Sequence, residues 1–362
     1  MITPSPEAVS CNPGVDLYMT KKKTVFGILI MLSAITLPMA DERCQAGMVS
    51  FTFDDGRASV YSHALPVLKR NHQVATIGIT YAFCVYGGKE FMTIQQILEL
   101  QRQGWEVASH GLTHSNPKKI PTVYSQEKIT GWEKEDKKLN IYRAPYAYEN
   151  VAGLLDGSSI MNAAASMDAL RQSPGSYYFD SQRGQLYVRP AGSARTAKLT
   201  IRAISCQREI EFSKKELEKL GCKIKTYITP YNSWPAELRE LGEPLYSCIA
   251  SGGNRANWRE GFDPHAIGRF VVREDDKVSA LKKLVKRYAI ENDGWVVFCF
   301  HGIGDNTGWE PWSLDKLEEF SAWLAKKEVK TVTIAEGAAL FAASPVTKPR
   351  AAPRAERSDD EP

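Results

Sequence analysis

The sequence predicts an α/β fold with a parallel β-sheet, and three observations support that prediction. Strand-like and helix-like segments alternate along much of the chain, in the order of repeated βα units. Polar clusters directly follow several apolar strands, as in parallel sheets that build a site at the carboxyl ends of their strands. The 362 residues, 43% of them hydrophobic, suffice for one large α/β domain with additions or for two ordinary domains. A barrel and an open doubly wound sheet both fit this pattern.

The first βα units are predicted from alternation and helix-end signals. Residues 49–53 alternate apolar and polar side chains, which is typical of a strand. Thr93 and Gln96 form a capping box for a helix that ends before Gly104. The predicted elements of this part are a strand at 49–53, a helix at 59–70, a strand at 74–80, a helix at 93–103 and a strand at 105–109.

The βα pattern resumes after a long interruption. Ser213 and Glu216 form a second capping box, which predicts that a helix begins there and runs to Gly221. The later predicted elements are a strand at 225–229, a helix at 235–241, a strand at 246–250, a helix at 276–291, a strand at 294–300, a helix at 313–327, a strand at 330–333 and a short final helix.

The interruption, residues 121–204, differs in composition from the rest of the chain. It has little helical periodicity and is enriched in Tyr, Gly, Ser and Asn. Residues 177–188 have β-prone arms around a polar turn that contains Gly184, which predicts a β-hairpin. We interpret the segment as a small β-rich insert; the alternative is a long decorated loop, which is uncommon at this length.

The two ends of the chain differ from the folded part. Residues 1–40 resemble an export signal, with lysines at 21–23, an apolar stretch at 24–37 and small residues up to Ala40. Met19 is the expected true start, and an uncleaved signal anchor is the alternative. We therefore expect a protein exported to the periplasm or the cell exterior, without a stable membrane span. The tail at 343–362 is rich in Pro, Ala and charge and is predicted to be disordered.

The overall charge argues against nucleic acid as a partner. The formal net charge is +4, from 46 basic and 42 acidic residues. Nucleic-acid-binding domains concentrate a larger basic excess on one face.

Two acidic residues follow the first predicted strand. Asp54 and Asp55 are adjacent and precede Gly56, which allows a sharp turn. Neighbouring like charges disfavour each other's ionisation, and a cation beside one of them would relieve that conflict. The alternative is an ordinary solvated turn.

Histidines follow two other predicted strands. His110 and His114 are four residues apart, so their imidazoles can reach one ion, as zinc sites require. His301 follows an apolar strand and suits proton transfer near neutral pH, although a buried structural histidine is the alternative. Cys299, two residues earlier, is expected to be a buried free thiol.

Together these residues predict a catalytic metal site. Asp55, His110 and His114 would supply one carboxylate and two imidazoles, which leaves coordination positions open for water and substrate. Asp54 would then be free to act as a base and His301 as an acid.

At this point the sequence resembles the polysaccharide deacetylase family, the NodB homology domain. Residues 52–56, 109–114 and 229–232 resemble its first, second and third motifs, and residues 300–303 resemble its last motif. The resemblance implies a distorted (β/α) barrel with fewer than eight strands, over a domain at 41–342 that the insert at 121–204 interrupts. It does not supply a clean fourth motif, for which residues 252–263 offer Arg255, Arg259 and Asp263. A second Arg-Ala-Pro-Tyr sequence at 143–146 imitates the third motif, but 229–232 follows a predicted strand and is preferred.

The resemblance also implies roles for the motif residues. Asp55, His110 and His114 would bind a divalent metal, for which zinc is expected. Asp54 would be the general base and His301 the general acid. The backbone N–H of Tyr231 would hold the oxyanion, and Pro230 belongs to the same groove-lining motif. Independently of the resemblance, Trp309 and Trp312 follow a predicted strand and could line a sugar groove or simply pack.

The expected reaction is metal-dependent removal of acetyl groups from an acetylated polysaccharide or glycan. N-acetyl groups of an amino-sugar polymer are the leading substrate. An O-acetyl esterase of a xylan-like polymer and a non-catalytic sugar-binding relic of the fold are the alternatives. A glycosidase with paired carboxylates is disfavoured, because Asp54 and Asp55 are neighbours and could not flank a bond.

Overall fold

The computed structural model describes residues 47–157, 159–192, 199–304 and 306–343. The predicted export signal lies outside these residues, as does the predicted tail except for Ala343. Within the described ranges, no helix combines the length and the apolar character that a membrane span requires.

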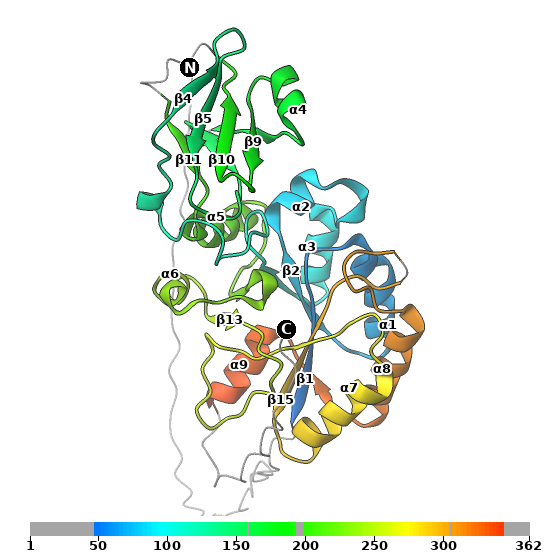
Figure 1. Cartoon of the computed structure of the whole chain (residues 1–362). Coiled ribbons are helices and arrows are strands. Elements are labelled where there is room, and N and C mark those ends of the chain that lie inside the picture. Colours follow the sequence, from blue (N-terminus) through cyan, green and yellow to red (C-terminus); the bar gives the residue numbers. More distant parts are fainter. Residues whose placement is uncertain (1–46, 158, 193–198, 305, 344–362) are drawn as a thin grey trace, which may run out of the picture. The chain divides into compact units, whose positions relative to one another are not determined.

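A curved sheet of parallel strands forms the centre of the protein (Figure 1). Its order is β13-β12-β3-β2-β1-β15-β14, every neighbouring pair is parallel, and β16 pairs with β1. A bridge between Ala250 and Ile267 continues the pairing beyond β13. These pairings confirm the predicted distorted (β/α) barrel. The strands are β1 (Met48–Phe53), β2 (Ala75–Ile79), β3 (Glu106–Ser109), β12 (Thr226–Ile228), β13 (Cys248–Ala250), β14 (Phe270–Val271), β15 (Trp295–Phe300) and β16 (Lys330–Thr331).

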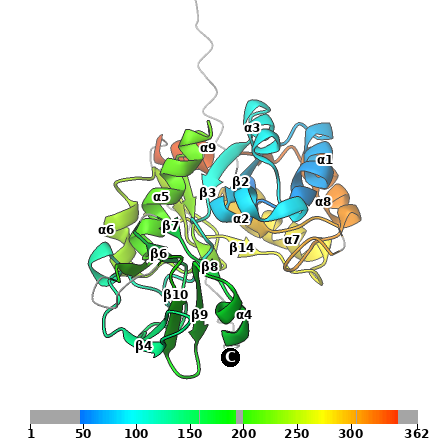
Figure 2. The same ribbon diagram turned by 90° about the horizontal axis from the view of Figure 1, so that it is seen from above.

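Helices cover the outer face of this sheet, as Figure 2 shows for α1, α3, α7 and α8. Alternate side chains of β1 point toward them, and the Phe51 ring packs edge-on against Phe320 of α8 at 5.9 Å. Here η marks a 3₁₀- or π-helical segment. The helical segments are η1 (Val60–Ala64), α1 (Leu65–Arg70), α2 (Tyr81–Tyr86), η2 (Gly88–Glu90), α3 (Ile94–Arg102), α5 (Cys206–Lys219), η5 (Pro230–Asn232), η6 (Ala236–Leu238), α6 (Arg239–Gly242), α7 (Val278–Leu284), η7 (Val285–Ile290), α8 (Leu314–Lys326) and α9 (Ile334–Ala343).

Helix starts show where local signals decided the structure and where packing did. Thr93 caps α3 through the predicted capping box with Gln96. The prediction that a helix begins at Ser213 is wrong, because α5 begins seven residues earlier with Ser205 as its N-cap. Ser213 is fully buried inside α5, where it donates to the Ile210 carbonyl and accepts from the Ser109 hydroxyl.

A buried carboxylate ties α9 to the strands. Glu106 at the start of β3 accepts hydrogen bonds from the hydroxyls of Thr76 (2.9 Å) and Thr226 (2.5 Å) and from the Ala335 N–H (2.9 Å). Burial raises the pKa of Glu106, although these donors oppose the rise. The side chain therefore joins three elements and satisfies an N–H of the first turn of α9.

We expect Glu106→Ala to lower the free energy of unfolding by about 3 kcal/mol, because three buried donors lose their acceptor. Glu106→Gln is the matched control and should cost much less. Its carbonyl can still accept from Thr76 and Ala335, and its amide can donate to the Thr226 hydroxyl. Denaturant unfolding of both variants checks this, and equal losses would contradict the assigned contacts.

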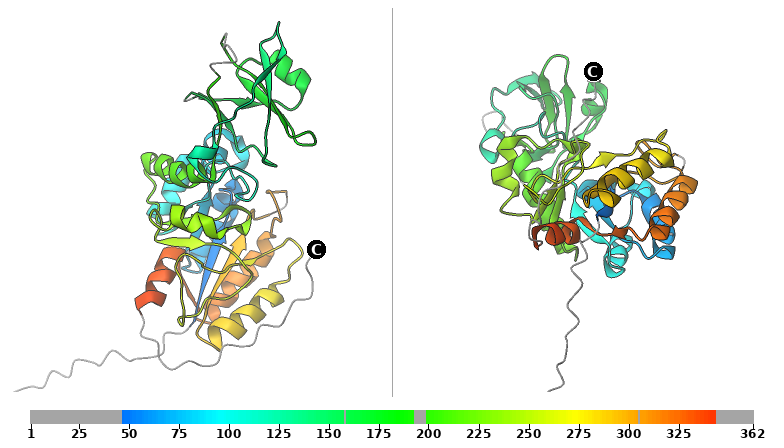
Figure 3. Two further views of the ribbon diagram at one scale, coloured as in Figure 1. Left: turned by 60° about the vertical axis from the view of Figure 1, so that its left-hand side comes forward. Right: turned by 90° about the horizontal axis from the view of Figure 1, so that it is seen from below.

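The segment between β3 and α5 forms two small sheets, drawn in green in Figure 3. The predicted hairpin is confirmed, since β9 and β10 pair antiparallel. The strands lie within 133–203; the insert boundaries at 121 and 204 stay a prediction. Residues 143–146 belong to this insert, in and just after β5, which supports the choice of 229–232 as the third motif. The elements are η3 (Tyr124–Gln126), β4 (Glu133–Asp136), β5 (Ile141–Pro145), β6 (Leu154–Asp156), β7 (Ser159–Ile160), β8 (Asn162–Ala163), α4 (Met167–Gln172), β9 (Ser176–Asp180), β10 (Gln185–Arg189) and β11 (Ile201–Ala203).

Candidate metal centre and acid–base pair

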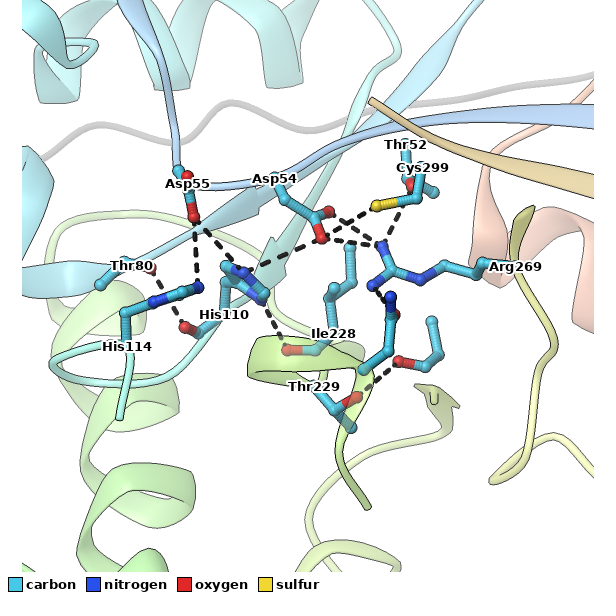
Figure 4. A network of polar contacts seen from close by, with 12 residues as sticks. Thr52, Asp54, Asp55, Thr80, His110, His114, Ile228, Thr229, Arg269 and Cys299 are labelled. Carbon is cyan, nitrogen blue, oxygen red and sulfur yellow. Dashed lines mark hydrogen bonds and ion pairs between the residues drawn. The ribbon is translucent and has the colours of Figure 1, made fainter. Parts of the chain in front are cut away.

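The sheet order brings the predicted site residues together. Strands β3, β2, β1 and β15 are consecutive neighbours, so the segments that leave their carboxyl ends meet at one edge. Asp54 and Asp55 follow β1, His110 follows β3 and His301 follows β15. Figure 4 shows Asp54, Asp55, His110 and His114 converging there.

Asp55, His110 and His114 form a group that fits a divalent cation. Asp55 Oδ1 lies 3.6 Å from His110 Nε2 and 3.3 Å from His114 Nε2, and the three ligand atoms all lie within 4.8 Å of one another. Asp55 Oδ1 is also buried without a hydrogen-bond partner. One carboxylate and two imidazoles form a donor set typical of catalytic metal sites, and the unpartnered carboxylate oxygen is one of those donors.

Backbone strain positions two of the three side chains. Asp55 has φ 69° and His114 has φ 61°, in the left-handed region that costs residues other than glycine about 1 kcal/mol or more. Such strain persists only where the surrounding contacts require it. Here it turns both side chains toward His110.

The two imidazoles differ in their surroundings. His110 Nδ1 lies 2.9 Å from the Ile228 carbonyl, which directs Nε2 toward Asp55. Burial would lower the pKa of His110, but Asp54 and Asp55 raise it above its usual value. For His114, burial is the stronger effect and lowers the pKa to about 4, so its nitrogen is unprotonated at neutral pH. Burial likewise opposes ionisation of Asp55, yet His110 holds the pKa of Asp55 below its usual range.

A buried glutamate holds the turn that carries both histidines. Glu209 in the first turn of α5 accepts from the N–H groups of Leu112 (2.8 Å) and Thr113 (2.9 Å) and from the Thr113 hydroxyl (2.6 Å). Gly111, at φ 83°, leaves room for it, since a Cβ there would lie 3.0 Å from Glu209 Oε2. Glu209 therefore fixes the spacing of His110 and His114 from outside the metal group. The sequence analysis did not single it out, because it lies 95 residues beyond His114.

Glu209→Ala should weaken metal binding by about 10- to 100-fold, because changes to outer-shell partners of metal ligands usually cost that much. Glu211→Ala, on the same helix but bonded to Tyr124 and Gln207, is the control and should bind the metal as tightly as the unmodified protein. Calorimetric titration with Zn²⁺ measures both affinities. Unchanged affinity in Glu209→Ala would contradict the positioning role.

Asp54 is held by an arginine from another part of the chain. Arg269 Nη1 donates to both Asp54 oxygens, at 2.9 and 3.0 Å, and Nη2 donates to Asn232 Oδ1 at 2.5 Å. Both members of the ion pair are buried. Burial opposes ionisation of Asp54, but Arg269, His110 and His301 together hold its pKa below the usual value. Asp54 is therefore ionised and fixed beside the metal group.

Arg269 fills the place for which the sequence offered other residues. Arg255 bonds to the Ala266 carbonyl, Arg259 to the Leu340 carbonyl and Asp263 to Arg239, so none of the three contacts Asp54. The arginine that pairs with Asp54 therefore lies outside the segment 252–263. The sequence feature that could have indicated Arg269 is its position after Gly268 and directly before a β-prone run, which forms β14.

His301 lies near Asp54, and an exposed tryptophan lies beside its ring. Its Nδ1 is buried without a partner among the described residues, and burial lowers the pKa of the imidazole. The Trp309 ring, 50% exposed, meets the His301 ring edge-on at 4.6 Å. Trp312, in contrast, is fully buried against Phe300, so the prediction that it lines a groove is wrong.

Tyr231 flanks the metal group at His114. Its ring is 59% exposed and lies 4.9 Å from the His114 ring, and its backbone has φ 58°. Pro230 is buried beneath it and packs near Gly111. Tyr231 and Trp309 thus present exposed rings beside two different histidines of the site.

Asp54, Cys299 and His301 form a second group whose ligand atoms lie close enough for a metal. Cys299 is a buried free thiol, as predicted, and its Sγ donates to Asp54 Oδ2 at 3.3 Å. The Arg269 guanidinium already neutralises Asp54 there and would repel a cation. The group of Asp55, His110 and His114 is therefore the better cation site.

Comparison with known proteins agrees with the motif resemblance. The sequence model of the polysaccharide deacetylase family matches residues 41–155, which confirms the resemblance over that part of the chain. No curated protein matches the chain in sequence.

Similar solved structures have low sequence identity. The Xyl-CE4 domain of a multidomain xylanase from the hindgut metagenome of Trinervitermes trinervoides is 13% identical, with a TM-score of 0.41 over 80% of this chain and 89% of that chain. A family 4 carbohydrate esterase from Streptomyces lividans in complex with acetate is 14% identical, with a TM-score of 0.39 over 79% and 91%. A CE4 family pseudoenzyme from Bacillus anthracis is 12% identical, with a TM-score of 0.39 over 80% and 65%.

Proposed function

From the match of residues 41–155 to the polysaccharide deacetylase family, we propose that this protein is an exported, metal-dependent hydrolase that removes N-acetyl groups from an amino-sugar polymer. The observation that carries the proposal is an ionised, buried Asp54 fixed by Arg269 next to the Asp55, His110 and His114 group. A pure binding protein needs neither a fixed base nor an orphaned metal-ligand oxygen. Zinc is the proposed metal.

The chain's own residues divide the work of acetyl hydrolysis. A divalent cation held by Asp55, His110 and His114 would supply Lewis acidity at the acetyl carbonyl. Asp54 is proposed to take the proton of the attacking water, and this role is supported by its ionised carboxylate, which Arg269 holds in one orientation. The Tyr231 backbone N–H is proposed to stabilise the oxyanion. His301 then gives a proton to the departing amine, and acetate is released.

Exposed rings at the site suit a sugar substrate. Tyr231 and Trp309 are both at least half exposed, and each lies against a histidine of the site. Sugar rings pack on aromatic faces, so these two rings are proposed to hold the acetylated sugar between His114 and His301.

Acetate release from matched substrates tests the proposal. The metal-loaded protein should release acetate from N-acetylated chitin oligosaccharides faster than from O-acetylated xylan oligosaccharides. The reverse preference would assign an O-acetyl esterase instead. Binding of the oligosaccharides without any acetate release would favour a non-catalytic relic. A sugar-binding relic would need no partner for a catalytic base, whereas here Arg269 pairs with Asp54.

A further inference from the structure

Arg57 is a cation at the site that the proposed reaction does not use. It comes two residues after Asp55 and is joined to Phe91 by an isolated β-bridge. Its guanidinium carbon lies 4.6 Å from the centre of the Phe91 ring, in a cation–π contact. The flat group is therefore held in place by an aromatic face rather than by hydrogen bonds.

The guanidinium of Arg57 has two long ion pairs and incomplete hydrogen bonding. Nη2 lies 3.6 Å from Asp55 Oδ2 and Nη1 lies 3.5 Å from Glu90 Oε2, and neither approach is a hydrogen bond. Nε is buried without a partner. The two Nη atoms therefore have carboxylates nearby, whereas the buried Nε–H has no acceptor among the described residues. A mostly buried guanidinium with long ion pairs and an N–H lacking an acceptor can take a further acceptor group.

The charges around the site also leave room for an anion. With a divalent cation bound, Asp54, Asp55 and Glu90 would contribute three negative charges against two from the cation and one each from Arg269 and Arg57. Glu90 is 79% exposed in its side chain and can turn away into water. The centre is thus net positive on the side where Arg57 lies.

The position of Arg57 places such an anion close to the reacting group. A Cβ on Gly308 would lie 2.7 Å from Arg57 Nε, so the segment that carries Trp309 passes directly over the guanidinium. Arg57 therefore lies between Asp55 of the metal group and the loop whose ring flanks His301. A sugar bound at the metal would bring its own substituents, or those of the next sugar, to this arginine.

We propose that Arg57 binds a carboxylate of the substrate, so that the natural substrate is an acetylated glycan in which the acetylated sugar carries or adjoins an acidic group. A planar carboxylate can take two N–H groups of a guanidinium at once, which neutral sugar hydroxyls cannot match in strength. This inference rests on the proposed deacetylase function.

Two oligosaccharides of equal length test whether Arg57 binds a substrate carboxylate. One alternates N-acetylglucosamine with a uronic acid, and the other is a neutral chitin oligosaccharide. Arg57→Gln should lower kcat/KM for the acidic substrate by about 10- to 100-fold, mainly through KM, because it removes a charged hydrogen-bond partner. For the neutral substrate, kcat/KM should change by less than about threefold by the same reasoning. Added salt should raise KM for the acidic substrate in the unmodified protein and not in Arg57→Gln.

Arg259→Gln is the matched control, since Arg259 also lies over a phenylalanine ring, that of Phe341, but packs on α9. It should leave both substrates unaffected. Equal losses on both substrates in Arg57→Gln would overturn the proposal and assign Arg57 to the support of Asp55. If the unmodified protein releases no acetate from either substrate, the proposed deacetylase function is contradicted, and the role of Arg57 is tested by binding alone. Calorimetric affinities of the two oligosaccharides for both proteins then decide the role of Arg57.

Discussion

Asp54→Asn is expected to lower the rate of acetate release by about 10³-fold or more while the metal stays bound. The asparagine amide cannot accept the proton of the attacking water. Its one oxygen can still accept from Arg269, so one of the two hydrogen bonds to Arg269 is retained. Asp54 is not one of the three grouped ligands, so metal content should remain that of the unmodified protein. Turnover measurement and elemental analysis on the same sample check both parts.

The matched control for this variant is Asp263→Asn. Asp263 is a partly buried carboxylate that also pairs with an arginine, Arg239, but contacts none of the site residues. Its replacement should leave turnover unchanged. Substantial activity in Asp54→Asn would remove Asp54 as the base, and loss of the metal would place Asp54 among its ligands.

Arg269→Met should lower turnover at neutral pH by about 100-fold and shift the pH dependence. Arg269 is the largest influence that lowers the pKa of Asp54 against burial, so its removal raises that pKa. Asp54 acts as the carboxylate, so activity is present above its pKa and lost below it. The acid limb of the pH–rate profile should therefore move to higher pH in the variant.

Arg269→Met is also expected to cost about 3 kcal/mol of stability, because it leaves a buried carboxylate without its partner. Arg269→Lys keeps the charge and serves as the comparison. Its acid limb should move less, although one ammonium cannot bond to Asp54 and Asn232 as the guanidinium does. An acid limb in the same place for all three proteins would contradict the role of Arg269.

Local sequence signals were sufficient for most strands of the parallel sheet and for the grouped ligands, but not for β14. Asp55, His110 and His114 follow strands whose apolar patterns are clear, and parallel strands bring their carboxyl ends to one edge. The capping box at Thr93 was likewise decided within four residues of sequence. In these places the chemistry depends on residue type and on short-range geometry, which a sequence displays.

Contacts between distant segments account for what could not be predicted. Arg269 reaches Asp54 across 215 residues, and its neighbours in sequence carry no motif that marks it. Ser213 imitates a helix start, but burial of its hydroxyl against Ser109 lets the helix run through it. Trp312 follows a site histidine in sequence, yet it packs into the core. Each outcome depends on which partner tertiary packing supplies.

The central claim is that one divalent cation binds between Asp55, His110 and His114. Anomalous diffraction from crystals grown with Zn²⁺ tests it most directly. A single strong peak within bonding distance of Asp55 Oδ1 and the Nε2 atoms of both histidines is the expected result. An absent peak at this position, or a peak centred instead on Asp54, Cys299 and His301, would contradict the account.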